Sequence, residues 1–508
     1  MTRIRHVCPA VLTFCAAVSL NAQPDLRTIV KAWVDSHQQQ IVAELIQLLS
    51  IPNIAADRPN IRRNAVALVS MLRQRGFTPE LLETEGNPLV YGELRVPGAS
   101  RTLLLYAHYD GQPVEPKSWK QEDPFSPVVR TGRVDQGGQK VADLASVTKF
   151  EDDWRVYARS ASDDKSPIVA LCAALDALKA SGLVPTSNLR VVLDGEEEAS
   201  SPSLVPAIGR YGQKLRADAI IILDGPGHSS GRPTIVFGAR GIVTFDLTVF
   251  GPKVGAHSGN YGNWMPNPAL RLASLLSSMK NDDGRVTVPG FYDAVTPFSA
   301  ADRALLDGVP DDSERMLKTF GIAKPERGFP KLQEAVQYPT LNIRGLASSH
   351  VGPGARTIIP DRAVAAMDIR LVKETTAADL IEKLQGHIRR QGYHLVGDEP
   401  DDATRAEHDK IARLAVSGSS TRAYRTSPDD PQATAVIGAI TRTYGAPPVL
   451  IRTLGGTVPI AQFIDALSFP AIGLPVVNFD NNQHEENENL RIGHLFEAVV
   501  TIAALLRM

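Results

Sequence analysis

The stretch Leu103-Leu-Leu-Tyr-Ala-His-Tyr-Asp110 decides the fold, because a short apolar run ends directly in side chains that can carry chemistry. The same pattern returns in Leu189-Arg-Val-Val-Leu-Asp-Gly-Glu-Glu-Glu198 and in Ala219-Ile-Ile-Ile-Leu-Asp224. Between these runs, Pro167–Ala180 and Ser203–Leu215 are typical of helices. Continuous apolar strands separated by helices predict an α/β domain with a mostly parallel sheet that helices cover on both faces.

The pattern changes near residue 240. We predict a strand over Gly241–Phe250, followed by a helix, a strand, two paired strands and a helix: Asn267–Met279, Tyr338–Arg344, Thr357–Leu371 and Ala377–Gln391. This order predicts a small α+β sandwich inserted into the larger fold. The polar stretch Ser417–Pro431 is predicted to be the linker back. The larger domain would then comprise residues 23–239 and 425–508, and the inserted domain residues 240–424.

Composition excludes several classes of protein. The chain has 508 residues, more than one ordinary domain of about 150 residues requires. With 54 basic and 56 acidic residues its net charge is -2, which argues against a nucleic-acid partner. We find no internal repeat and no membrane span in the sequence, so a soluble globular protein is expected.

The N-terminus has the pattern of a secretory signal. Arg3 and Arg5 precede an apolar run over 7–20, and Ala22 offers a cleavage site, so we predict a signal peptide over residues 1–22 and a secreted or periplasmic protein. The alternatives are an ordinary N-terminal helix or a lipoprotein signal at Cys15, although Phe14 is bulky for the latter. Removal of the signal would leave Cys172 as the remaining cysteine, with a packing role.

Acidic residues and histidines cluster beside the predicted strands and helices. The five clusters are His108 with Asp110, Asp163 with Asp164, Glu196–Glu198, Asp224, and His484 with the acidic residues after it. Each has an ordinary explanation as well: a surface-loop histidine, a helix N-cap or an exposed run of charge. Loops past the carboxyl ends of strands are where α/β sites assemble, so together they indicate a pair of divalent ions such as zinc. A further carboxylate could act as a base on water.

The order of these motifs resembles the co-catalytic zinc peptidases of metallopeptidase family twenty, from about Val30 to the C-terminus, with the dipeptidase branch closest. The resemblance implies an α/β catalytic domain interrupted by a lid domain that also makes a homodimer. It implies two ions per chain, most readily Zn²⁺, with Mn²⁺ or Co²⁺ as alternatives. His108 and Asp224 would hold one ion, Glu198 and His484 the other, and Asp163 would bridge them. Glu197 would be the general base, and Asp110 would orient His108.

The resemblance also implies residues that contact the substrate. His257, followed by Asn267, looks like the lid segment that reaches the neighbouring subunit's site, where the histidine would stabilise an oxyanion. Arg370, with Gly456 and Thr457, would bind the substrate carboxylate, and Thr357 would assist. The ordinary alternative for Arg370 is a surface residue of a strand.

The sequence departs from the family where Ala158-Arg-Ser160, Ser166 and Ala199 stand at positions that often hold glycine, so loop geometry could differ. Every proposed ligand and the base are present. The expected activity is hydrolysis of an amide bond in dipeptides or at the C-terminus of short peptides. Two alternatives stay open: an N-acyl-amino-acid deacylase on the same scaffold, and a non-catalytic binding protein on a retired peptidase fold.

Overall fold

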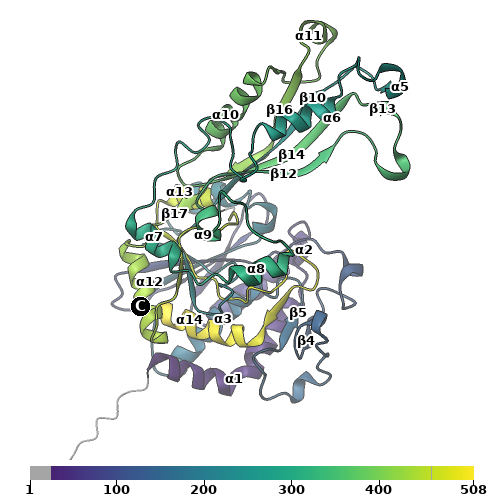
Figure 1. Cartoon of the computed structure of the whole chain (residues 1–508). Coiled ribbons are helices and arrows are strands. Elements are labelled where there is room, and N and C mark those ends of the chain that lie inside the picture. Colours follow the sequence, from purple (N-terminus) through teal and green to yellow (C-terminus); the bar gives the residue numbers. More distant parts are fainter. Residues whose placement is uncertain (1–24, 459) are drawn as a thin grey trace, which may run out of the picture.

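A computed structural model describes residues 25–458 and 460–508 (Figure 1). The signal peptide predicted over residues 1–22 lies outside these described residues. In Figure 1 a lower body, which holds both ends of the described chain, carries an elongated upper arm built from the middle of the sequence. Among the described residues, no helix combines the length and the apolar character that crossing a membrane requires.

The lower body is built on an eight-stranded sheet in the order β1-β2-β6-β3-β7-β19-β8-β18. Its strands are β1 (Thr78–Leu82), β2 (Leu89–Leu94), β3 (Thr102–His108), β6 (Asn188–Asp194), β7 (Ala219–Ile222), β8 (Thr234–Val236), β18 (Val449–Ile451) and β19 (Ala471–Gly473). Strands β6, β3, β7 and β19 run parallel to one another at its centre. The predicted α/β class with a mostly parallel sheet is therefore confirmed.

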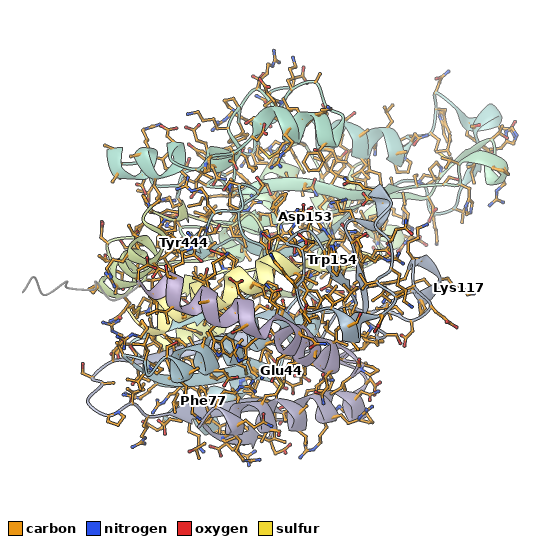
Figure 2. The ribbon with its side chains drawn as sticks, turned by 90° about the horizontal axis from the view of Figure 1, so that it is seen from below. Glu44, Phe77, Lys117, Asp153, Trp154 and Tyr444 are labelled. Carbon is orange, nitrogen blue, oxygen red and sulfur yellow. The ribbon has the colours of Figure 1, made fainter. Side chains whose placement is uncertain are left out.

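Helices cover both faces of this sheet, as its continuous apolar strands require. One face packs against α1 (Leu26–Leu49), α2 (Arg58–Gln74), α3 (Lys165–Ala180), α12 (Pro431–Tyr444) and α14 (Ile492–Leu506). The other face packs against α4 (Leu204–Tyr211) and α13 (Ala461–Leu467). Figure 2 shows α1, marked by Glu44, beside the yellow α14 on the underside of the body. Helix α3 lies inside this layer and buries nearly all of its side chains.

The arm contains a five-stranded sheet in the order β12-β14-β10-β16-β15. These strands are β10 (Gly241–Phe250), β12 (Thr340–Ala347), β14 (Arg362–Leu371), β15 (His394–Leu395) and β16 (Ile411–Thr421). Helices α6 (Pro268–Ser277) and α10 (Ala377–Arg390) bury their apolar faces against it and form a separate core. At its far end lie β11 (Ala256–His257), β13 (Ile358–Ile359), α5 (Ser258–Tyr261) and α11 (Asp402–Glu407) (Figure 1).

Two details of the arm differ from the prediction. Residues 417–421 were predicted to begin a linker, but they complete β16, which pairs with β10. Polar residues suit this strand because much of its length is exposed on one side. Within Thr357–Leu371 the two strands do not pair with each other, since β13 pairs with β11 whereas β14 pairs with β10 and β12.

The chain leaves the body at β9 (Gly238–Ala239) and returns at β17 (Tyr424–Arg425), and these two strands pair with each other. Part of the intervening segment folds back onto the body: α7 (Ala300–Asp307), α8 (Ser313–Phe320) and α9 (Leu332–Ala335). Arg452 Nε lies 2.7 Å from Asp302, and His228 Nε2 lies 3.1 Å from Asp311. The middle of the chain is therefore more than the α+β sandwich that the sequence predicted.

A small three-stranded sheet lies beside the larger one. Its strands are β4 (Val128–Arg130), β5 (Arg155–Tyr157) and β20 (Asn489–Arg491) in the order β20-β5-β4. Strand β5 leads into the loop that carries Asp163, and β20 follows the loop that carries His484. Their antiparallel pairing, with Tyr157 opposite Asn489, therefore draws together two loops that are more than 300 residues apart in the sequence.

Candidate active site

The topology of the large sheet brings the reactive side chains together. His108 is the last residue of β3, and Asp194, opposite it in the register, is the last residue of β6. Glu197 and Glu198 follow in a short 3-10 turn over Glu197–Ala199. Asp224 comes two residues after the end of β7. Because parallel neighbouring strands end at one edge, these side chains meet there.

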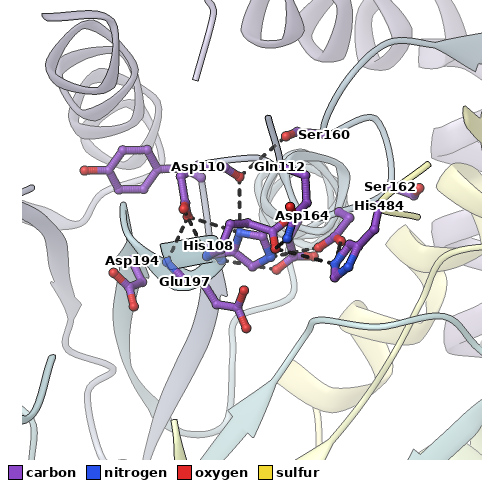
Figure 3. A network of polar contacts seen from close by, with 12 residues as sticks. His108, Asp110, Gln112, Ser160, Ser162, Asp164, Asp194, Glu197 and His484 are labelled. Atoms are coloured by element: carbon purple, nitrogen blue, oxygen red, sulfur yellow. Dashed lines mark hydrogen bonds and ion pairs between the residues drawn. The ribbon is translucent and has the colours of Figure 1, made fainter. Parts of the chain in front are cut away.

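Two groups of potential ligands meet at this edge and share Asp163. One comprises His108, Asp163 and Asp224, and the other comprises Asp163, Glu198 and His484; in each group the ligand atoms lie within 4.8 Å of one another. His108 Nε2 is 2.8 Å from Asp163 Oδ1, and His484 Nε2 is 3.1 Å from Asp163 Oδ2. The two imidazole rings, labelled in Figure 3, therefore both contact the Asp163 carboxylate.

Asp110 links the histidine side of the cluster to the glutamate side. Its Oδ1 lies 3.4 Å from His108 Nδ1, and the backbone carbonyl of Asp110 lies 3.2 Å from the same nitrogen. The same carboxylate accepts the backbone N–H groups of Glu197 and Glu198, each at 3.0 Å. One buried side chain therefore orients the His108 ring and also fixes the turn that carries both glutamates (Figure 3).

The buried carboxylates of the cluster repel one another, and bound cations would offset this repulsion. Burial, together with the neighbouring carboxylates, raises the pKa of Glu197, raises that of Glu198 to about 7 and raises that of Asp224 to about 6. The two ligand groups together hold three carboxylates and two imidazoles, the oxygen and nitrogen donor set of borderline divalent ions. The buried oxygen Asp163 Oδ2 faces His484 Nε2 at 3.1 Å. The residues present therefore fit a pair of divalent metal ions.

The histidines and Asp163 stabilise one another's charged forms. Burial opposes the charge on Asp163, but hydrogen bonds from His108 and His484 hold its pKa well below its usual range. Burial also opposes the charge on His108, yet Asp110 and Asp163 raise its pKa. The pKa of His484 is raised chiefly by its hydrogen bond to Asp163.

Outside the two ligand groups, Arg370 and Thr457 contact each other. Arg370 on β14 donates from Nη1 to Thr457 Oγ1 at 2.7 Å, and exposed Gly456 precedes Thr457. Arg240, which the sequence did not single out, donates from Nε to the Gly455 carbonyl at 2.9 Å. Burial and the adjacent Arg370 lower the pKa of Arg240 to about 10. Two guanidinium groups therefore border one glycine-rich loop.

His257, Thr357 and Asn267 lie in the arm. His257 is exposed on β11, with Nε2 3.4 Å from Thr357 Oγ1 and Nδ1 accepting the Gly259 N–H at 3.1 Å. Asn267 caps α6 by accepting the Ala269 N–H at 2.9 Å. In Figure 1 β13 and α5 lie at the far end of the arm, away from the large sheet. Across the described chain, no hydrogen bond or ion pair joins His257 to the metal cluster.

Two further residues contact the cluster: Gln112, which the sequence analysis did not identify, and Glu488, which it grouped only with the acidic residues after His484. Gln112 donates from Nε2 to Glu198 Oε2 at 2.6 Å. Glu488 is fully buried and accepts the backbone N–H of Asp163 at 3.0 Å. Both lie close in sequence to residues that were singled out, Gln112 after Asp110 and Glu488 after His484, and this proximity was the available signal.

Comparison with known proteins identifies the family. The model of peptidase family M20/M25/M40 matches residues 104–508. The chain belongs to this peptidase family. The Cys-Gly metallodipeptidase dug1 of Schizosaccharomyces pombe is 26% identical over 484 residues, covering 92% of this chain and 94% of that protein. The human Beta-Ala-His dipeptidase is 25% identical, covering 95% of this chain and 92% of its own.

A solved structure with the same fold is the M20 family metallo-carboxypeptidase Sso-CP2 of Sulfolobus solfataricus. It aligns with a TM-score of 0.72 at 29% identity and covers 92% of this chain and 98% of its own. This M20 peptidase is therefore a metal-dependent hydrolase of the dipeptidase branch, as the sequence motifs predicted. The two ligand groups that share Asp163 offer donors for two metal ions.

The prediction of a secreted or periplasmic location is wrong. The chain matches the Cys-Gly metallodipeptidases of Schizosaccharomyces pombe and Saccharomyces cerevisiae over 92% and 93% of its length, and these relatives overturn the assignment. The signal-peptide interpretation of residues 1–22, which lie outside the described part of the chain, is withdrawn with it.

Proposed function

We propose that this M20 peptidase is a dinuclear metallodipeptidase that hydrolyses the amide bond of dipeptides or the C-terminal bond of short peptides. The observation that carries the proposal is the pair of ligand groups that share Asp163, with Glu197 beside them. In this proposal His108 and Asp224 hold one ion, Glu198 and His484 hold the other, and Asp163 bridges them. When bound, the ions, most readily Zn²⁺ and alternatively Mn²⁺ or Co²⁺, would supply Lewis acidity toward water and the scissile carbonyl.

Glu197 is the proposed general base. Its backbone N–H donates to Asp110, and its side chain interacts electrostatically with His108 and Asp224 without belonging to either ligand group. The Glu197 carboxylate takes a proton from the attacking water and delivers it to the leaving amine. Asp110 keeps the His108 ring in the orientation that leaves Nε2 facing Asp163.

Arg370 and Thr457 form the proposed clamp for the substrate carboxylate. A planar guanidinium suits bidentate recognition of a carboxylate, and the Thr457 hydroxyl and the exposed backbone of Gly456 add polar contacts. We assign Asn267 and Thr357, which lie in the arm, a role in binding the substrate. The clamp favours peptides with a free C-terminal carboxylate, because Arg370 and the adjacent Arg240 place two positive charges beside the single carboxylate of Asp368, which lies 4.0 Å from Arg370 Nε.

Residues 240–424, which comprise the arm and the helices α7–α9 that pack on the body, form the proposed lid and dimerisation domain, and the rest of the described chain is the catalytic domain. Strand β12 lies at the edge of the arm sheet and is exposed over most of its length, with Leu346 63% exposed. Such an apolar edge favours pairing with another chain, and a second copy would cover it. His257 would then reach the partner's metals and stabilise the oxyanion of the tetrahedral intermediate.

A mixed-dimer experiment tests the cross-subunit role of His257. Homodimers of Glu197→Gln and of His257→Ala are each expected to be nearly inactive. After random exchange of equal amounts, about half of the dimers are mixed, and one of the two sites in each has both its base and a wild-type histidine from the partner. We therefore expect about a quarter of all sites to regain activity, measured as dipeptide hydrolysis after exchange of differently tagged chains.

The control is the pair of unmixed variants carried through the same exchange protocol. If His257 served its own chain, every site in every combination would carry one defect. Verified exchange of subunits with no recovered hydrolysis would therefore rule out the cross-subunit role.

The choice of substrate class is tested by a panel. A carboxylate clamp also suits N-acyl amino acids, so the deacylase remains the second candidate on the same residues. We expect the zinc-loaded protein to hydrolyse Cys-Gly and β-Ala-His faster than N-acetyl amino acids, and to be inactive on dipeptide amides that lack the carboxylate. Faster turnover of N-acetyl amino acids would favour the deacylase, whereas no hydrolysis at full metal occupancy would favour the non-catalytic binding protein.

A further inference from the structure

Glu488 makes more contacts with the loop of Asp163 than any assigned role explains. The residue directly precedes β20 and is fully buried. Its Oε1 accepts the backbone N–H groups of Ser162 and Asp163, each at 3.0 Å. Its Oε2 accepts the Ser160 N–H at 3.0 Å and Arg159 Nη1 at 2.8 Å. The loop before α3 is thus wrapped around a single carboxylate.

These contacts leave Glu488 no free oxygen for a metal. Both oxygens are occupied by N–H donors, and Glu488 is not a member of either ligand group. Arg159, itself buried, balances its charge. Burial raises the pKa of Glu488 and Arg159 lowers it, while three backbone donors favour the carboxylate form. The side chain lies behind the bridging residue and acts on it through the backbone.

The same residue is anchored to the loop of His484. The Asn489 N–H donates to the Asn481 carbonyl at 2.8 Å and closes the loop that carries His484, with Glu488 at its end. The Ala158 N–H donates to the Glu488 carbonyl at 3.2 Å. Glu488 therefore holds two loops from distant parts of the sequence together, and these loops supply Asp163 and His484, whose side chains lie 3.1 Å apart.

The Asp163 loop needs such support. Ser160 has a φ of 63°, in the left-handed region that glycine occupies most easily. Its N–H bond to Glu488 and the bond from Asn53 Nδ2 to its Oγ, at 2.9 Å, hold it in that conformation. Without the Glu488 carboxylate, the amide groups of Ser160, Ser162 and Asp163 would be buried without acceptors, and the loop would rearrange.

We propose that Glu488 is a positioning residue that sets the bridging geometry of Asp163 relative to His484 and thereby the affinity of the site for its second metal ion. The inference rests on the proposed ligand roles of Asp163 and His484. Residues that hydrogen-bond to the ligands of a metal site typically contribute about 10- to 100-fold to metal affinity or activity. Glu488 contacts three backbone amides of the Asp163 loop rather than the side chain of a metal ligand.

The test is Glu488→Gln, which keeps the size of the side chain but turns an acceptor oxygen into an NH₂ donor that faces other donors. Competition for Zn²⁺ with a chromophoric chelator should show that the weaker of the two sites loses about 10- to 100-fold in affinity. The visible spectrum of the Co²⁺-loaded variant should change, and kcat should fall with little change in KM. Glu488→Asp keeps the charge and should recover part of the lost affinity.

The matched control is Glu497→Gln on α14, which removes a partly exposed carboxylate paired with Arg27 at 3.1 Å and should leave Zn²⁺ affinity unchanged. A Glu488→Gln variant with a lowered melting temperature but wild-type Zn²⁺ affinity and kcat would overturn the proposal. If that variant does not fold, wild-type affinity in Glu488→Asp would overturn it and reduced affinity would support it. Failure of the wild-type protein to bind two ions would instead defeat the proposed function.

Discussion

Replacing Glu197 by Gln is expected to lower kcat by about 10²- to 10⁴-fold, since a neutral amide cannot accept the proton of the attacking water. The bound metals should remain, because Glu197 belongs to neither ligand group. KM should change little, since the clamp at Arg370 and Thr457 is untouched. Steady-state hydrolysis of Cys-Gly, together with elemental analysis of the same preparation, measures all three quantities.

The adjacent residue supplies the matched control. Glu198→Gln removes one of the ligands grouped with Asp163 and His484, so it should weaken metal binding while leaving the general base in place. Added metal should restore part of the activity of Glu198→Gln but none of that of Glu197→Gln. Reversed behaviour of the two variants would show that the base and the ligand had been assigned to the wrong glutamates.

Asp163→Asn is expected to have the second-largest effect. Asp163 is the residue common to both ligand groups, so a neutral side chain there should weaken both ions rather than one. We expect the loss of activity to exceed about 100-fold, the upper end for residues that only support a ligand. Zinc content after gel filtration and kcat at saturating substrate provide the measurement.

Asp135→Asn, which alters an exposed carboxylate paired with Arg133 at 2.7 Å, is the control and should retain both ions and full activity. Retention of two tightly bound ions by Asp163→Asn would show that the bridge lies elsewhere.

The strand ends of the large sheet could be predicted because their physics is local. A run such as Ala219–Leu223 is apolar throughout and can only be buried on both faces, so the polar residue that follows, Asp224, must lie at the sheet edge. The same reasoning located His108 and the glutamate turn. Asp163 and His484 needed the resemblance to the family, since the pairing of β5 with β20 that joins their loops leaves no pattern in the sequence.

The features that the sequence did not reveal depend on contacts between residues that lie far apart in the sequence. Helices α7 and α8 have eight residues each, and their position is set by contacts such as that of Asp311 with His228. The polar strand over residues 417–421 forms because β10 offers a partner, not because of its own propensity. Glu488 lay within an acidic run that solvent exposure would also explain, and only its burial distinguishes it.

At one of the positions where the family often has glycine, the structure shows how a serine is accommodated. Of Ala158, Ser160, Ser166 and Ala199, Ser160 alone adopts a left-handed backbone among these four described residues. An L-residue there costs about 1 kcal/mol or more relative to glycine, which its hydrogen bonds to Glu488 and Asn53 offset. These two hydrogen bonds therefore hold Ser160 in the left-handed conformation that glycine adopts most easily.

The central claim is that two metal ions in this cluster are required for dipeptide hydrolysis. The most direct measurement is a titration of the metal-free protein with Zn²⁺ while Cys-Gly hydrolysis is followed, with bound metal determined in parallel. The account predicts that activity rises to a plateau at about two equivalents of Zn²⁺ per chain, as a two-metal site requires. A plateau at one equivalent, or no hydrolysis when two ions are bound, would contradict it.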